Sequence, residues 1–171
     1  MTENTSYDEG RERDYESLIE TIDLPDSRKN FMRARWLDQV MWMEAACKKT
    51  QRWYYVLRLT AIVGGILVPA LIGRGAAMAA TVLSLVVAAS VAVEEFFHFG
   101  ERWRHYRQSV ELLKIQAWHF FQMSGPYRSF RDHAAAYPAF AGKVEEILQN
   151  EVHVYISEVV KEKKEDPNTE S

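Results

Sequence analysis

A long run almost without charge, from Leu59 to Val93, constrains this chain more than any other feature of its sequence. The run has 35 residues and one charged side chain, Arg74, although the whole chain has 21 Lys and Arg and 24 Asp and Glu. It divides into two apolar stretches of about 20 residues, and each, as a helix of about 30 Å, matches the hydrocarbon thickness of a bilayer. The sequence therefore predicts an all-α integral membrane protein with two spans joined by a tight turn.

The first span is predicted over about residues 54–73. Residues 53–55, Trp-Tyr-Tyr, stand where an aromatic belt meets the lipid headgroups. Arg58 lies one turn further in, at a depth from which its side chain can extend back to the headgroups. The middle of the span has residues that permit a kink or a close helix contact: Gly64, Gly65 and Pro69.

The second span is predicted over about residues 76–96. In lipid, small residues at regular spacing let two helix backbones approach closely. This pattern has two interpretations that the sequence leaves open, namely packing within the hairpin and packing between subunits. The small residues occur at every fourth position: Ala76, Ala80, Ser84, Ala88 and Ala92.

The segments outside the spans divide into two tails and a helical region. Residues 1–26 hold nine acids and two arginines, which predicts a disordered acidic tail with room for a short helix around Tyr15–Ile22. Residues 27–164 form the predicted two-span helical domain, and residues 165–171 a solvated tail. We expect the helix of the second span to continue to about Met123, and irregular chain to follow as far as about Pro138.

Three amphipathic patterns predict helices that pack together outside the spans. The first is an apolar stripe before the first span, the second is a seam after the second span, and the third lies in a final helix over about residues 139–164. Together they predict a helical bundle on one side of the membrane. Their apolar positions are Trp36, Val40, Met43 and Cys47; Trp103, Tyr106, Val110, Leu113, Ala117 and Phe120; and Phe140, Val144, Ile147 and Leu148.

Basic residues cluster on the flanks of the hairpin, whereas its turn has only Arg74. We therefore expect a plasma-membrane protein, and the positive-inside rule places both of its termini in the cytoplasm and the turn outside the cell. The flanking residues are Lys48, Lys49, Arg52, Arg58, Arg102, Arg104 and Arg107.

The ionisable residues at the end of the second span are the best candidates for a functional site. Glu94 and Glu95 can be plain interfacial residues, or, repeated around a ring of subunits, a cation-attracting pore mouth. Glu95 and His98 also have the Glu-x-x-His spacing of di-iron bundles, but the spans lack the further carboxylates that such a site needs. Arg58 is a candidate ion-pair partner for Glu94 or Glu95. No catalytic motif, phosphate loop or cofactor signature is present, and the scattered basic residues disfavour nucleic-acid binding.

Several motifs recur in order along about residues 33–160. Gln51-Arg52-Trp53-Tyr54 precedes the first span, and the final helix has Phe140, Val144, Glu145, Ile147 and Glu151. The other main positions are Arg35, Trp36, Leu37, Trp42, Trp103, Tyr106, Arg107, Glu111, Gly125, Pro126 and Tyr127. In order and spacing these motifs resemble the SLATT family (SMODS- and SLOG-associating two-transmembrane domains), in the branch catalogued as a domain of unknown function.

The resemblance implies a membrane effector of bacterial conflict systems, in which a nucleotide signal or a separate sensor protein triggers pore formation. From the residues alone, two functions are expected alternatives: a homo-oligomeric pore or channel, and a non-conducting anchor or scaffold for a soluble sensor or enzyme. A third, weaker alternative is a soluble bundle with the hairpin as its buried core. Enzymatic activity and a bound cofactor or metal are not expected.

Overall fold

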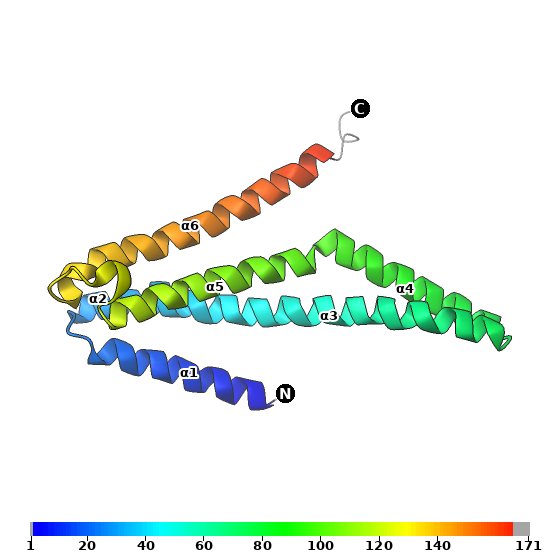
Figure 1. Ribbon diagram of the computed structural model, residues 1–171, viewed down its shortest axis with the longest axis horizontal. Helices are drawn as coiled ribbons and strands as arrows, with labels where there is room; N and C mark the ends of the chain where they lie inside the picture. Colours follow the sequence, from blue (N-terminus) through cyan, green and yellow to red (C-terminus); the bar gives the residue numbers. More distant parts are fainter. Residues whose placement is uncertain (1, 166–171) are drawn as a thin grey trace. The chain divides into compact units, whose positions relative to one another are not determined.

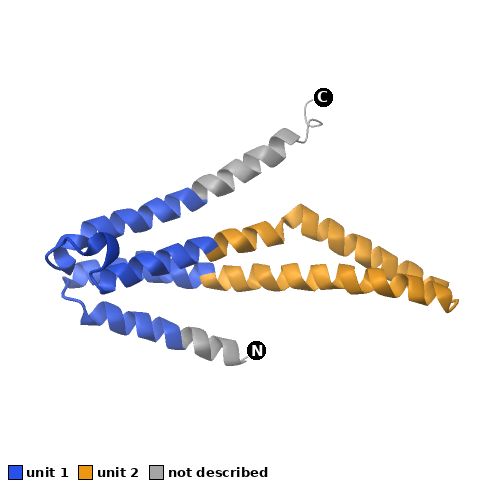
Figure 2. Ribbon diagram, viewed as in Figure 1, with its two compact units in different colours: residues 1–43, 108–171 blue, residues 44–107 orange. Residues whose placement is uncertain are grey.

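The computed structural model describes the backbone of residues 2–165 and the side chains of residues 10–151. The chain divides into unit 1, residues 1–43 and 108–171, and unit 2, residues 44–107 (Figure 2). Every regular element in the described residues is helical, as the sequence predicts (Figure 1). In chain order these are α1 (Thr2–Thr21), α2 (Asp26–Phe31), the π-helical stretch η1 (Met32–Leu37), α3 (Asp38–Gly73), α4 (Ala77–Phe97), α5 (Phe99–Phe121), the 3-10 turn η2 (Gly125–Tyr127) and α6 (His133–Glu165).

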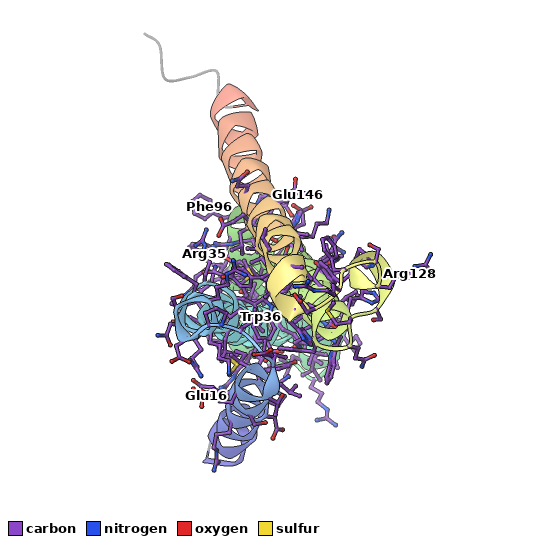
Figure 3. The ribbon with its side chains drawn as sticks, turned by 90° about the vertical axis from the view of Figure 1, so that its left-hand side faces the viewer. Glu16, Arg35, Trp36, Phe96, Arg128 and Glu146 are labelled. Carbon is purple, nitrogen blue, oxygen red and sulfur yellow. The ribbon has the colours of Figure 1, made fainter. Side chains whose placement is uncertain are left out.

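Unit 1 is built around an aromatic core. Trp36 from η1 is 1% exposed, and its indole nitrogen donates a hydrogen bond of 3.1 Å to the Leu113 carbonyl oxygen of α5. The rings of Phe120 and Phe140 stack with their centres 4.5 Å apart, which joins α5 to α6. Figure 3 shows Trp36 among the helices of this unit, whereas the labelled Glu16 and Arg128 project outward. The predicted apolar stripe is confirmed as a packing face from Trp36 to Met43 and the predicted seam from Val110 to Phe120. Cys47, Trp103 and Tyr106 belong to unit 2 and are not part of this core.

The acidic N-terminal segment differs from its prediction as a disordered tail. The structure has α1 there, and Ile19, Ile22 and Leu24 are all part of the unit 1 core. The Tyr15 ring contacts the edge of Trp36 at a centre-to-centre distance of 5.3 Å. The buried apolar residues of this segment lie at its C-terminal end, among acids that dominate an average over the segment. Residues 166–171, the rest of the predicted C-terminal tail, lie outside the described residues.

The Gly125-Pro126-Tyr127 motif forms the connection between α5 and α6. Gly125 has a positive φ of 55°, and a Cβ there would lie 2.7 Å from the His119 Nδ1 atom, so glycine suits this position on both counts. Tyr127 is buried, and its hydroxyl donates a 3.0 Å hydrogen bond to Gln116. The irregular stretch is shorter than predicted, since α6 begins at His133 and runs through Pro138.

Unit 2 contains the hairpin of α3 and α4, which lie side by side in Figure 1. Its turn is closed by backbone hydrogen bonds from Arg74, Gly75 and Ala76 to carbonyls at the end of α3, with Gly75 at a φ of 75°. The sequence predicts one continuous helix from the second span to about Met123, and this prediction is wrong. His98 adopts a left-handed conformation with a φ of 48° and separates α4 from α5.

Candidate membrane hairpin

The contact between α3 and α4 is closest at Gly64. A Cβ placed on Gly64 would lie 2.4 Å from a Val87 methyl carbon, a distance that a real side chain does not tolerate. A Cβ on Gly65 would meet nothing within 4 Å, although the sequence offered both glycines for the contact. Pro69 lies inside α3, which continues as a helix to Gly73. Gly64 is thus the glycine on which the close approach depends.

The predicted small-residue face is only partly a hairpin contact. Ala80 is 3% exposed, but Ser84, Ala88 and Ala92 are exposed. A step of four residues advances about 40° beyond a full helical turn, so a strict four-residue stripe rotates away from its partner helix. From the N-cap Ala76 onward, the residues that are at least partly buried instead alternate steps of four and three: Ala76, Ala80, Leu83, Val87, Ser90 and Glu94.

Most of the hairpin surface is apolar and exposed. Met78 is 79% exposed, Ile66 69% and Leu85 66%. In the most apolar 18-residue windows of the two helices only 6% and 11% of the residues are buried, unlike the core helices of a soluble protein. Both helices are long and apolar enough to cross a membrane.

The serine and threonine hydroxyl groups of the two predicted spans need no water. Each donates a hydrogen bond of 2.8–3.0 Å to the carbonyl oxygen four residues earlier in its own helix. A polar group without a partner is costly in hydrocarbon, and this arrangement removes that cost. The four groups belong to Thr60, Thr81, Ser84 and Ser90.

Aromatic rings gather at the end of the hairpin where α3 enters and α4 leaves. Trp53 stacks on Phe99 at 6.5 Å, and Tyr54 stacks on Trp103 at 6.1 Å. A Cβ on Gly100 would lie 2.9 Å from the Tyr54 ring, so this ring packs closely on α5. The residues 53–55 that the sequence assigned to an interfacial belt therefore belong to a ring cluster with α4 and α5, a cluster we call the aromatic belt: Trp53, Tyr54, Tyr55, Phe96, Phe97, Phe99 and Trp103.

Arg58 and Glu94 line one hollow of about 220 Å³ between α3 and α4. The buried Ser90 and the apolar Ile62 and Val91 also line it. The predicted ion pair between Arg58 and Glu94 is not formed, since among the described residues neither has an ion pair or side-chain hydrogen bond. The structure thus brings both predicted charges to one site and leaves room between them.

Glu95 and His98 lie beside this hollow in the sequence but do not line it. Glu95 is exposed, and His98 has left the helical conformation. The Glu-x-x-His spacing therefore does not place the carboxylate and the imidazole on one helical face. No group of three metal-ligating side chains occurs in the described part of the chain.

Unit 1 has a second hollow, of about 180 Å³, which sequence reasoning missed. Arg35 and Glu145 line it and form two hydrogen bonds, one of them 2.8 Å from Nη2 to Oε2. The hydrogen bond from Arg35 lowers the pKa of the Glu145 carboxyl and raises that of the guanidinium. Arg35 and Glu145 are both among the positions that resemble the SLATT family. They are 110 residues apart in the chain, so no local sequence pattern indicates that they are in contact.

The other motif positions have distinct structural roles. Leu37 is buried with Trp36, whereas Trp42 is 57% exposed. Glu111 pairs with Lys114 at 3.7 Å. Arg52, Arg107 and Pro126 are exposed, and Trp103 and Tyr106 are half-buried.

No curated protein and no solved structure matches the chain. A family profile does match, over residues 38–135, which include the hairpin, the aromatic belt and the α5–α6 turn. The Arg35-Trp36-Leu37 run and the final helix lie outside the matched residues. The chain belongs to the family described as "Protein of unknown function (DUF4231)".

Proposed function

We propose that unit 2 inserts into the plasma membrane as a two-span hairpin, and that several copies assemble into an ion-conducting pore. The observation that carries this proposal is the exposed apolar surface of α3 and α4, together with their internally bonded hydroxyls. Two helices cannot enclose a water path, so a pore needs several subunits. The face of Ser84, Ala88 and Ala92, which the hairpin leaves exposed, supports close packing between copies.

The orientation follows from charge. Lys48, Lys49 and Arg52 precede the aromatic belt on α3, and Arg104 and Arg107 follow it on α5, so both termini face the cytoplasm and Arg74 faces outside. In such a ring Arg58, Glu94, Glu95 and His98 lie near the cytoplasmic mouth, where repeated carboxylates favour cations. A Cys47→Ser, Arg74→Cys chain tests the orientation. An impermeant thiol reagent labels it in intact cells, and labelling only after lysis reverses the orientation.

Ion flux from liposomes containing the purified protein tests conduction. Ala88→Leu enlarges a residue of the exposed small-residue face, and Ala79→Leu makes the same change on another exposed part of α4. We expect Ala88→Leu to abolish both flux and the oligomer seen by light scattering in detergent, and Ala79→Leu to retain both. Tight vesicles with the unmodified protein, or equal loss in both variants, contradict the proposal.

A second candidate function is a non-conducting anchor for a soluble partner. The observation that favours it is the apolar face of α5 in unit 1, where Leu112, Ile115 and Trp118 are 40–46% exposed. These residues recur every three positions on one side of the helix, as in a docking face. A stable monomer in detergent that co-purifies with a soluble protein favours this function over the pore.

The resemblance to the SLATT family supports a role as a membrane effector of a bacterial conflict system, with a nucleotide-sensing or enzymatic partner as a separate protein. The genes beside this one test that role. A neighbouring nucleotidyltransferase or sensor gene is the expected finding, whereas a neighbourhood of housekeeping genes argues against it.

A further inference from the structure

The hollow between α3 and α4 is lined by one cation and one anion, and neither has an ion-pair partner among the described residues. Arg58 is one turn from the aromatic belt on α3, and Glu94 precedes Phe96 of the belt on α4. The belt marks the headgroup level of a bilayer. Charges at that depth are costly unless they are paired or hydrated. Arg58 is exposed and Glu94 half-buried, so an occupant of the hollow that supplies both signs of charge would pair with each of them.

The chemistry of the hollow changes along its length. Arg58 and Glu94 lie at the end of the hollow near the aromatic belt. Ile62 and Val91 lie about one helical turn from them, toward the middle of the hairpin. Ile62 and Val91 are 51% exposed, so the inner end opens to the surroundings of the hairpin. A ligand that fits this order is charged at one end and apolar at the other.

A phospholipid with a primary amine has that form. Its phosphate matches a guanidinium, which binds phosphate oxygens through paired N–H donors. Its ammonium matches a carboxylate, and its acyl chains continue along the apolar end. We infer that this hollow binds one phospholipid of the phosphatidylethanolamine class, with the phosphate on Arg58 and the amine on Glu94. The inference rests on the proposed membrane insertion but does not require a pore.

Native mass spectrometry of the purified full chain in detergent tests the inference. The probes are phosphatidylethanolamine, phosphatidylcholine and phosphatidylglycerol with identical acyl chains, added in equal amounts. Phosphatidylcholine keeps the charges but lacks N–H donors, and phosphatidylglycerol lacks the amine. We expect phosphatidylethanolamine to be retained about tenfold over the other two, the effect of one charge-assisted hydrogen bond.

Three variants assign the contacts. Glu94→Gln should reduce phosphatidylethanolamine retention to the phosphatidylglycerol level, and Arg58→Gln should lower retention of all three lipids. Glu95→Gln, which removes the same charge from the exposed neighbour, should change nothing. Helical content and elution volume verify that each variant is folded.

Several results would overturn the inference: equal retention of the three lipids, an unchanged preference in Glu94→Gln, or the same loss in Glu95→Gln. Displacement of the lipid by excess soluble glycerophosphoethanolamine would also overturn it, because the ligand would then be a free phosphate ester. Absence of ion flux in liposomes, with the lipid preference intact, contradicts the pore alone. A chain that carbonate washes release from membranes contradicts both.

Discussion

Unit 1 and unit 2 bury opposite kinds of side chain. Unit 1 encloses Trp36, Phe120, Tyr127 and Phe140, each at most 2% exposed. In unit 2 the buried residues of the hairpin are small, with Gly64, Ala80 and Ser90 inside and branched aliphatic residues outside. Unit 1 therefore has the arrangement that water favours, and the hairpin of unit 2 has the arrangement that lipid favours.

The contrast separates two sources of stability. A core in water gains free energy when large apolar side chains leave the solvent. In a bilayer the surroundings are as apolar as leucine, so the hairpin depends on close backbone contact and internal hydrogen bonds. The same substitution should therefore have different effects in the two units, and the following variants test that difference.

The largest effect is expected for Trp36→Ala. The substitution leaves a cavity at the centre of the unit 1 core and removes the indole hydrogen bond to the Leu113 carbonyl oxygen, at a cost of about 3–5 kcal/mol. Trp53→Ala removes the same residue type from the half-exposed aromatic belt of unit 2 and should cost much less. Thermal unfolding of the two purified variants, followed by circular dichroism, measures the difference. Equal destabilisation would mean that the units do not differ in this way.

The next effect is expected at the helix contact of the hairpin. Gly64→Ala forces a new methyl group against Val87 and should cost about 1–3 kcal/mol, whereas Gly65→Ala should be close to neutral. Adding Val87→Ala to Gly64→Ala should restore part of the loss, since it removes the clashing methyl groups. If the double variant shows no recovery in the same unfolding measurement, the close contact is elsewhere.

A smaller effect is expected for Asp132→Ala at the start of α6. The Asp132 carboxylate accepts a 2.8 Å hydrogen bond from the Ala135 backbone N–H, and this bond lowers the pKa of Asp132. Loss of such a helix cap lowers the stability of the helix, and Asp132→Asn, which keeps an oxygen acceptor, should retain most of the stability. Unfolding by denaturant compares the two, and an equal loss in both would show that charge, not capping, matters.

The smallest effect concerns the Arg35–Glu145 pair. The pKa of Glu145 is lowered from its ordinary value of 4.5, so the pair contributes stability above that pH and loses it as the pH falls through the lowered value. Both side chains are largely exposed, and the contribution should be below about 1 kcal/mol and decline with salt. Glu145→Gln should therefore unfold with a weaker dependence on pH below 4.5 than the unmodified chain. An identical pH profile would contradict this role.

Local patterns predicted the elements of both units, because charge depletion and apolar spacing are properties of neighbouring residues. The charge-free run predicted the hairpin, and the stripe from Trp36 to Cys47 predicted a packing face. Burial of Ile19 in α1 was missed because acids dominate that segment. The break at His98 was missed because histidine, although it adopts a positive φ more often than most residues, is far more often helical, and no glycine or asparagine stands at that position.

The candidate site was only half predictable for a similar reason. Arg58 was identified as a candidate partner of Glu94 or Glu95 from their depth in the spans, but the open hollow that Arg58 and Glu94 line arises from the packing of α3 on α4. The turning of the small-residue face away from α3 depends on the register of that contact. Such features involve residues far apart in the chain, and one sequence carries no signal for them.

Extraction of isolated membranes with alkaline carbonate tests the central claim, which is that unit 2 spans a bilayer. The account predicts that the full chain stays in the pellet after the wash and moves to the supernatant only with detergent. Release of the chain by carbonate alone would contradict it, because a protein with two spans cannot leave the bilayer in water.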